Sequence, residues 1–192
     1  RLSDKLKWEE TTTYNAGIDF GILNNRLTGA VDVFYKESND LLADVATADG
    51  SNFSNRSWQN IGSFTTKGIE LSLNADVIKR DNLNWNVNFN ATTYQREITK
   101  LNADYIRVGE NVVGTGTQAQ AHFVGYTPNS FLLYKQLYDN AGTPIEGAFA
   151  DLNGDNVINS EDKYVYRNPD PKLILGFASN FNYGNFDFYF NL

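Results

Sequence analysis

Apolar and polar residues alternate along six stretches of the chain, which is the period-2 pattern of a β-strand with two unlike faces. In one stretch, Ile69 and Leu71 alternate with Glu70 and Ser72. No stretch shows the spacing of an amphipathic helix. We therefore expect an all-β fold of antiparallel strands, at Tyr14–Phe20, Leu27–Tyr35, Ile69–Val77, Trp85–Ala91, Leu173–Tyr183 and Phe186–Leu192.

The connections between these strands alternate between short and long. Short turns are expected around Asn24-Asn25, from Lys79 to Asn82, and at Gly184-Asn185, because Asn and Gly tolerate positive φ. Long polar segments cover residues 39–65 and 97–171. Short turns on one side and long loops on the other are typical of outer-membrane barrels, whose strands of about 9–11 residues cross the bilayer at a tilt.

The sequence thus predicts an antiparallel transmembrane β-barrel fragment of about six strands, with short periplasmic turns and long extracellular loops. In such a barrel the strand at 85–91 runs outward and the strand at 173–183 runs inward. The apolar stretch from Phe123 to Tyr138 therefore cannot be a lone crossing between them. We expect it to be part of an external hairpin or to pack against the loops, and Pro128 within it agrees.

The amino-acid composition indicates what each face of the predicted strands would contact. The 192 residues include 25 Asn, and aromatic residues make up 14%. On a barrel wall the apolar set would face lipid, and the Asn, Asp and Ser set would face the lumen, where an amide hydrogen-bonds polar solutes without adding charge. A soluble secreted β-sandwich that binds carbohydrate also alternates apolar and polar positions, so the pattern alone leaves this alternative open.

Charge and rare residues exclude several functions. The formal net charge of −7 argues against nucleic acid as a partner. The absence of Cys excludes disulfides and thiol nucleophiles. The single His122 gives little basis for a catalytic triad, and we expect it to cap or line a loop. We do not expect an enzyme, and a glycan hydrolase with a carboxylate pair is a distant third interpretation.

Five groups of motifs follow one another along essentially the whole chain. They are Leu6-Lys7-Trp8-Glu9 with Asn15-Ala16-Gly17-Ile18-Asp19-Phe20, Asn60-Ile61-Gly62 with Lys67-Gly68-Ile69-Glu70, Val108-Gly109-Glu110 with Gly125-Tyr126, Asp151-Leu152-Asn153-Gly154-Asp155 with Asn168-Pro169, and Tyr183 to Asp187. In this order they resemble SusC/RagA-type TonB-dependent outer-membrane transporters. The sequence departs from that pattern at Asn156, where Gly is usual, and from Gly114 to Ala121.

The resemblance implies part of a barrel of about 22 strands in the outer membrane of a Bacteroidota-type bacterium. Such transporters import oligosaccharides or peptides together with a SusD-like surface lipoprotein, and TonB pulls on their plug from inside. We find no plug domain or TonB box in this sequence. We therefore expect residues 1–192 to be a partial TonB-dependent receptor β-barrel domain, truncated at both ends, with 97–171 as a long extracellular loop region within it.

The segment from Asp151 to Asp162 spaces oxygen-bearing side chains like a calcium-binding EF-hand loop. Asn156 stands at the turn position, where it would adopt the left-handed conformation that Gly usually supplies. A polar loop rich in Asx-turns without any ion explains the same spacing. If Ca²⁺ binds, the ligands are expected to be Asp151, Asn153, Asp155, Asn159, Asp162 and the Val157 carbonyl.

Several aromatic residues fall in the predicted external loops. They could stack on sugar rings or contact a partner lipoprotein, or they could simply pack the loops together. These candidates are Phe53, Trp58, Tyr105, Phe123 and Tyr126.

Overall fold

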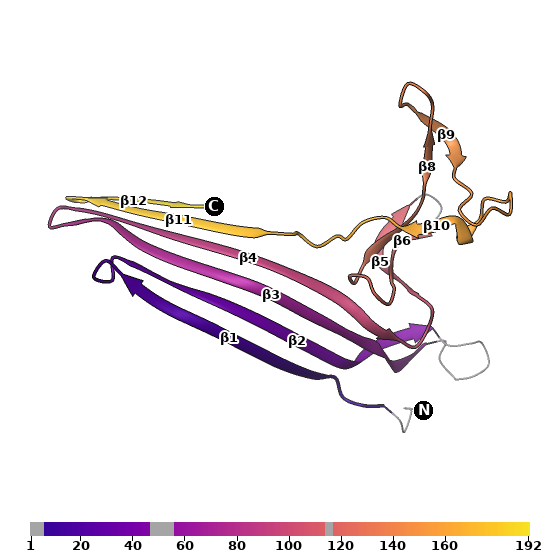
Figure 1. The fold of residues 1–192 in the computed structure, drawn as a ribbon, viewed down its shortest axis with the longest axis horizontal. Helices are drawn as coiled ribbons and strands as arrows, with labels where there is room; N and C mark the ends of the chain where they lie inside the picture. Colours follow the sequence, from indigo (N-terminus) through magenta and orange to yellow (C-terminus); the bar gives the residue numbers. More distant parts are fainter. Residues whose placement is uncertain (1–5, 47–55, 114–116) are drawn as a thin grey trace. The chain divides into compact units, whose positions relative to one another are not determined.

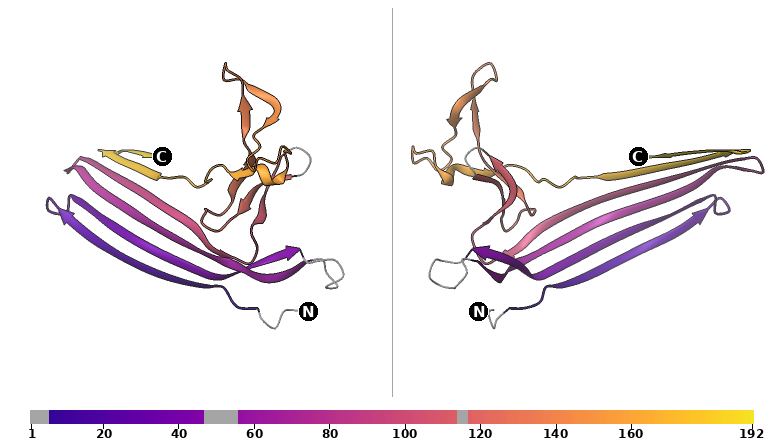
Figure 2. Two further views of the ribbon diagram at one scale, coloured as in Figure 1. Left: turned by 45° about the vertical axis from the view of Figure 1, so that its right-hand side comes forward. Right: turned by 180° about the vertical axis from the view of Figure 1, so that it is seen from behind.

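Six long strands form one antiparallel sheet in the computed structural model, which describes residues 6–46, 56–113 and 117–192. The sheet order is β1-β2-β3-β4-β11-β12, and both views show the strands as a single layer (Figures 1 and 2). The all-β prediction and all six predicted strands are confirmed. The strands are β1 (Glu10–Ile22), β2 (Leu27–Ala46), β3 (Arg56–Arg80), β4 (Leu83–Leu101), β11 (Ile174–Tyr183) and β12 (Phe186–Asn191).

The remaining strands lie in a second compact unit, which spans Glu97–Asp170. A four-stranded sheet in the order β10-β7-β6-β5 and a two-stranded sheet of β8 and β9 make up most of it. The stretch from Phe123 to Tyr138 contributes to these sheets and not to the six-stranded one, as expected. The elements are β5 (Ile106–Val113), β6 (Thr117–His122), β7 (Ser130–Tyr134), β8 (Gln136–Tyr138), β9 (Pro144–Phe149), the 3-10 helix η1 (Ser160–Asp162) and β10 (Lys163–Val165).

The strands are longer than their alternating stretches predicted. Strand β2 has 20 residues and β3 has 25, and they remain paired at Leu42↔Asn60 and Ala43↔Gln59. The prediction of a loop over 39–65 is therefore wrong for 39–46 and 56–65. Backbone hydrogen bonds continue the pairing of β2 with β3 into segments where apolar and polar side chains do not alternate. A register shift between Ser38 and Leu42, with Asp40 at φ 54°, separates the two parts of this long hairpin.

The hairpin turns lie where the sequence predicted them. Asn24 and Asn25 have φ of 54° and 62°, and Gly184 has φ of 58°. The turn between β3 and β4 is shorter than predicted, since β3 continues to Arg80 and only Asp81-Asn82 remain between the strands. Among the described residues, no helix is long and apolar enough to cross a membrane.

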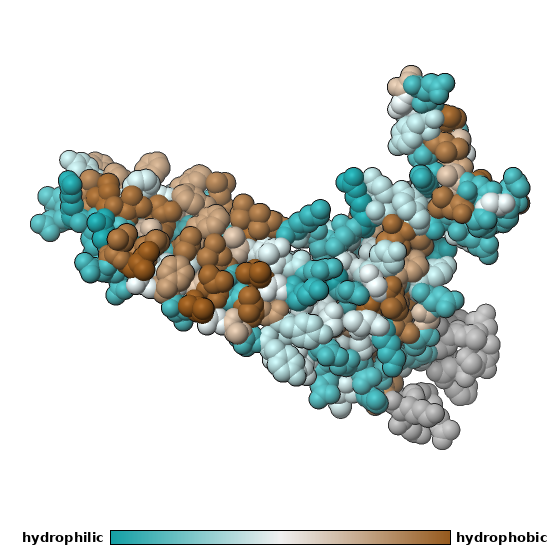
Figure 3. All heavy atoms as spheres, viewed as in Figure 1, coloured by the Kyte–Doolittle hydropathy of each residue, from teal (hydrophilic) through white to brown (hydrophobic). Residues whose placement is uncertain are grey.

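One face of the six-stranded sheet is apolar and exposed. Cross-strand register brings Ile18 opposite Val31, and Val31 opposite Leu71. Ile18 is 73% exposed and Phe186 is 78% exposed, and apolar side chains gather over this part of the sheet in Figure 3. A soluble sandwich buries such a face against a second sheet. The sandwich alternative is therefore wrong for this chain.

Close packing within the sheet requires glycine at two positions. A Cβ on Gly29 would lie 2.5 Å from Ser72 O and 2.8 Å from Cζ of Phe20, which is its cross-strand partner. A Cβ on Gly68 would lie 2.6 Å from Phe34 Cζ. Each phenylalanine ring thus covers the backbone of a neighbouring strand, an arrangement that fixes register between strands.

Candidate functional site

The face opposite the apolar one is lined by amides and carboxylates. Register places Asn180 opposite Asn86 and Asn182 opposite Asn84 on β11 and β4. The same face carries Asn74 and Asp76 on β3, as strand alternation requires. We call this set the amide face: Asn74, Asp76, Asn84, Asn86, Asn88, Asn90, Asn180, Asn182 and Asp187.

Side-chain hydrogen bonds connect the amide face across strands. Asn86 Nδ2 donates to Asn74 Oδ1 at 2.8 Å and to Asp76 Oδ1 at 3.0 Å, and Asn88 Nδ2 donates to Asn86 Oδ1 at 2.9 Å. At the β11–β12 hairpin, Asn182 Nδ2 donates to Asp187 Oδ1. Each amide carries both donor and acceptor groups. The arrangement provides a largely neutral wall that hydrogen-bonds water and polar solutes.

The Asp151–Asp162 loop is held together by its own carboxylates. The Asp162 side chain is fully buried, with Oδ1 accepting the Leu152 N–H at 2.7 Å and Oδ2 accepting the Asn159 N–H at 2.9 Å. These backbone donors, with that of Asn159 first, hold the pKa of the Asp162 carboxyl below its usual value. Asp162 therefore organises the loop from its C-terminal end.

Asp151 organises the other end of the same loop. Its Oδ1 accepts the Gly154 N–H at 2.6 Å and its Oδ2 accepts the Asn156 N–H at 2.7 Å. Asn156 has φ of 64°, so it adopts the left-handed conformation expected at the turn position. Asp155 accepts the Val157 N–H at 2.8 Å in the same manner. These are the Asx-turn bonds of the alternative without an ion.

The same loop retains lone pairs that a cation could use. A carboxylate oxygen that accepts one N–H has a second lone pair, and Asp151 and Asp155 present theirs from a largely solvent-exposed segment. Within the described residues, no group of three or more His, Cys, Asp or Glu side chains is placed to hold a metal ion. Calcium at Asp151, Asn153, Asp155, Val157, Asn159 and Asp162 stays a prediction.

Three of the predicted loop aromatics form one cluster. The rings of Tyr105 and Phe123 stack with centroids 5.4 Å apart, and the ring of Tyr126 meets Phe123 edge-on at 6.2 Å. The Arg107 guanidinium lies 5.9 Å from the Tyr105 ring centre. Trp58 is 56% exposed on β3, in the other unit, and Phe53 lies outside the described residues.

His122 supports the turn that carries Tyr126. Its Nδ1 accepts the Asn129 N–H at 3.1 Å, which requires an unprotonated Nδ1. Burial of the ring lowers the pKa of His122 below its usual value, which favours that neutral form. On the other side of the turn, Ile98 N donates to Tyr126 O at 2.9 Å. The histidine lines a loop, as expected.

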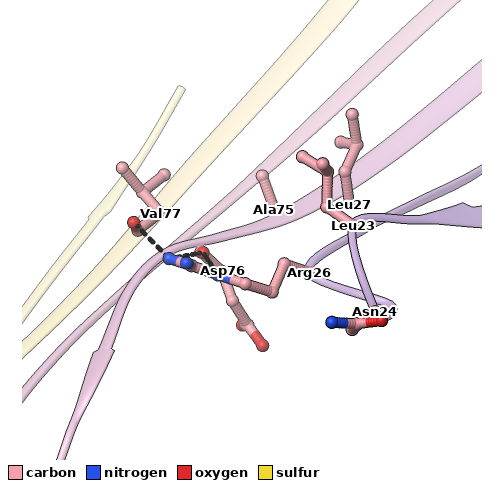
Figure 4. A pocket seen from close by; sticks show the side chains of 7 residues that line it. All are labelled: Leu23, Asn24, Arg26, Leu27, Ala75, Asp76 and Val77. Atoms are coloured by element: carbon pink, nitrogen blue, oxygen red, sulfur yellow. Dashed lines mark hydrogen bonds between the residues drawn. The ribbon is translucent and has the colours of Figure 1, made fainter.

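Sequence reasoning missed Arg26, which lies in the β1–β2 turn. Its guanidinium donates to the backbone carbonyls of Asp76 at 3.0 Å and Val77 at 2.8 Å. These carbonyls belong to the part of β3 that continues beyond the start of β2 (Figure 4). The available signal was an arginine in a tight turn just before an apolar strand.

Known proteins with similar sequences are TonB-dependent receptors. Residues 3–191 match the family model described as "TonB dependent receptor-like, beta-barrel". The whole chain is 44% identical to TonB-dependent receptor SusC of Bacteroides thetaiotaomicron, of which it covers 20%. It is 31% identical, over 96% of its length, to 20% of TonB-dependent receptor P26 of Formosa agariphila. The chain thus spans about a fifth of the length of these relatives.

Solved structures show the same fold. The RagAB peptide importer in its "closed-closed" state superposes with a TM-score of 0.73 at 22% identity, over 97% of this chain and 21% of the other. The RagAB peptide transporter gives a TM-score of 0.71 at 24% identity, over 96% and 21%. The chain therefore belongs to the TonB-dependent receptor β-barrel family and is of the SusC/RagA type.

Proposed function

We propose that this chain forms a sector of the barrel wall of an outer-membrane active transporter that imports oligosaccharides or peptides. The observation that carries the proposal is the pairing of an exposed apolar face with an amide face on one sheet. In a barrel of this family the first face contacts lipid and the second lines the lumen. Family membership supports the same assignment.

The exposure of the apolar face supports a location in the outer membrane. Phe188 is 75% exposed and Ile18 is 73% exposed, although side chains of this kind are usually buried in soluble proteins. Lipid removes the penalty of this exposure. Exposed Trp8 and Tyr183, at 90% and 60%, suit the aromatic belts at the membrane boundaries.

We propose a SusD-like lipoprotein and TonB as the partners of the complete transporter. The resemblance to SusC/RagA-type transporters supports both, and RagAB is itself named as a peptide importer. The unit Glu97–Asp170, which begins within the last residues of β4 and ends before β11, would lie on the extracellular side. Exposed Tyr105 and Tyr126 in this unit, together with Trp58, would contact cargo or the lipoprotein. The sequence candidate Phe53 belongs to the same proposal.

The amide face suits neutral, hydrogen-bonding cargo. Oligosaccharides and peptide backbones both carry many hydrogen-bond donors and acceptors and little net charge. An asparagine side chain can bond to these groups, and removing it from water costs less than removing a charged side chain. We propose no catalytic role, because the relatives are receptors. A bound Ca²⁺ would order the Asp151–Asp162 loop and would not perform chemistry.

Energy-dependent uptake by cells tests this proposal. The probes are mixed malto-, xylo- and manno-oligosaccharides in one arm and a casein peptide digest in the other, each measured with and without a protonophore. The transporter carries Asn86→Leu with Asn88→Leu on the amide face. Val87→Leu, between them on the apolar face, is the matched control.

We expect protonophore-sensitive uptake of one probe class to fall severalfold in the double variant and to stay unchanged in the control. Equal amounts of transporter in the outer membrane must be confirmed for each strain. If the unaltered transporter takes up neither probe class, or if the two variants behave alike, the proposal is contradicted.

A further inference from the structure

A cavity of about 560 Å³ lies beside the β1–β2 turn, where β3 continues past its neighbour. Ala75 pairs with Leu27, the first residue of β2, and Asp76 N donates to Arg26 O at 2.8 Å. The last residues of β3, from Val77 to Arg80, have no residue of β2 paired with them. Arg26, Asn24 and Asp76 line the cavity together with the apolar side chains of Leu23, Leu27, Ala75 and Val77 (Figure 4).

No carboxylate in the described part of the chain forms an ion pair with the Arg26 guanidinium, although the charge of nearby Asp76 interacts with it. Its Nε and Nη2 donate to carbonyl oxygens, at 2.8 to 3.2 Å, and Nη1 retains both of its N–H groups. The neighbouring carboxylate of Asp76 is engaged elsewhere: Lys79 Nζ lies 3.3 Å from Oδ2, and Asn86 Nδ2 donates to Oδ1. In Figure 4 the Asp76 carboxylate points away from the guanidinium.

The walls of the cavity continue the apolar face of the sheet. Leu27 and Ala75 are the last pair of that face before the turn, and their side chains extend to the same side as that of Leu23 in Figure 4. Leu23 is 71% exposed and Val77 is 42% exposed. A fixed guanidinium therefore lies at the end of an unpartnered apolar surface.

We propose that this cavity binds the headgroup phosphate of an anionic phospholipid, with an acyl chain lying along Leu23, Leu27 and Val77. The inference rests on the proposed membrane location of the apolar face. The two N–H groups that remain on Nη1 of Arg26 can donate charge-assisted hydrogen bonds to phosphate oxygens. In outer-membrane barrels the short turns face the periplasm, so the site would meet the inner leaflet of the membrane.

The apolar wall favours a lipid over a free anion. Inorganic phosphate would gain the guanidinium but would leave the leucine and valine side chains exposed. A phospholipid satisfies both parts of the site, since its phosphate contacts the guanidinium and its acyl chain covers the apolar side chains. Arg26 would also stay bonded to the β3 carbonyls, which holds the guanidinium in place before a lipid arrives.

The test is lipid binding by the complete transporter that contains this chain. The delipidated protein in detergent is titrated with phosphatidylglycerol, phosphatidylcholine or inorganic phosphate, and bound species are counted by native mass spectrometry. The variant is Arg26→Gln. Arg80→Gln, which removes the same charge at the same end of β3 but outside the cavity, is the control.

We expect one phosphatidylglycerol to bind with an affinity reduced about tenfold by Arg26→Gln, the loss of one charge-assisted interaction, and unchanged by Arg80→Gln. Phosphatidylcholine should bind more weakly, and inorganic phosphate should not compete. Equal binding by the two variants, or equal affinity for the two lipids, overturns the proposal. So does competition by inorganic phosphate, which would identify a free-anion site.

A second variant covers a failure of Arg26→Gln to assemble. Val77→Ser keeps the guanidinium and its carbonyl bonds, and it should weaken phosphatidylglycerol binding severalfold, so unchanged binding would overturn the proposal. Recovery of the unaltered protein in the outer-membrane fraction is measured separately. Its absence there would contradict the proposed function, whereas a membrane-inserted protein without selective lipid binding contradicts only this site.

Discussion

The indole N–H of Trp85 donates a hydrogen bond to Ser179 Oγ, 3.0 Å away, on the apolar face of the sheet. The two residues lie on the neighbouring strands β4 and β11, two residue pairs apart in register and on the same face. Each supplies what the other lacks, because an unpaired hydroxyl or indole N–H is costly where no water reaches it. The bond explains how a serine is accommodated among the side chains of the apolar face.

Replacing Ser179 should destabilise the barrel. Ser179→Ala leaves the Trp85 N–H without an acceptor, and we expect a loss of about 1 kcal/mol in the free energy of unfolding. Urea titration of the complete transporter in detergent micelles, followed by gel mobility of unheated samples, measures this loss. Ser179→Thr retains the hydroxyl and serves as the control. An alanine variant as stable as the threonine variant would show that the bond has no role.

The turn that carries Tyr126 should loosen in mild acid. Because burial lowers the pKa of His122 in the folded loop, the unfolded loop binds the extra proton more readily. Stability contributed by the neutral ring is therefore complete above about pH 6.5 and is lost as the pH falls toward the folded-state value. Hydrogen exchange at the Asn129 amide, expressed relative to the exchange rate of a free amide at the same pH, should show less protection below that pH than above it.

His122→Gln is the control for this pH dependence. A glutamine carbonyl can accept the Asn129 N–H and does not titrate. Exchange at residue 129 should then change with pH only as a free amide does. If the unaltered protein behaves in the same way as this variant, His122 does not control the turn.

Asp162 should be essential to the order of its loop. Asp162→Ala removes the acceptors of the Leu152 and Asn159 N–H groups and leaves these part-buried donors unpaired. We expect limited proteolysis to cleave residues 151–162 at least severalfold faster, whereas Glu146→Ala, at an exposed position of β9, should have little effect. Since the pKa of Asp162 is lowered, the same loop should lose stability only below about pH 3.8, where the unfolded carboxyl gains a proton.

Calcium gives the Asp151–Asp162 loop a separate test. If the loop binds Ca²⁺, adding the ion to protein treated with EDTA should slow proteolysis there, and Asp155→Asn should weaken the effect without loosening the ion-free loop. Mg²⁺, which demands stricter octahedral geometry, should protect less. If proteolysis proceeds at the same rate in Ca²⁺ and in EDTA, the loop does not bind the ion, and Asx-turn bonding alone explains the spacing of its Asp and Asn residues.

Alternation predicted the sheet because the two faces of its strands differ in polarity. Each strand must place apolar residues on one face, so the pattern reports the face directly. The segments 39–46 of β2 and 56–65 of β3 do not alternate regularly between apolar and polar residues, so their sequence resembled a loop although Leu42 and Asn60 are paired. The length of β2 and β3 was therefore underestimated in the segments where apolar and polar residues do not alternate.

The candidate sites were predictable only in part. The loop aromatics could be named one by one, but the β5–β6 pairing of Ile106 with His122, which brings Tyr105 to Phe123, depends on tertiary structure. The spacing of Asp151 and Asp162 was visible in the sequence, whereas the burial of Asp162 was not. Arginine in a tight turn before an apolar strand was the local signal at Arg26, but its bonds to the carbonyls of Asp76 and Val77 depend on the longer extent of β3.

Two adjacent residues on β2 test the central claim that the sheet separates lipid from lumen. Val33 pairs with Ile69 on the apolar face, and Asp32 pairs with Glu70 on the other. Because the 192 residues contain no Cys, Val33→Cys and Asp32→Cys each introduce one thiol that can be assigned by peptide mapping.

The reagent is a thiol-reactive spin label, and the complete transporter is reconstituted in lipid bilayers. We predict that a lipid-soluble relaxant, oxygen, reaches the label at residue 33, and that a water-soluble nickel complex reaches the label at residue 32 more readily than that at 33. The reverse order, or equal access of both relaxants to both positions, would contradict the account.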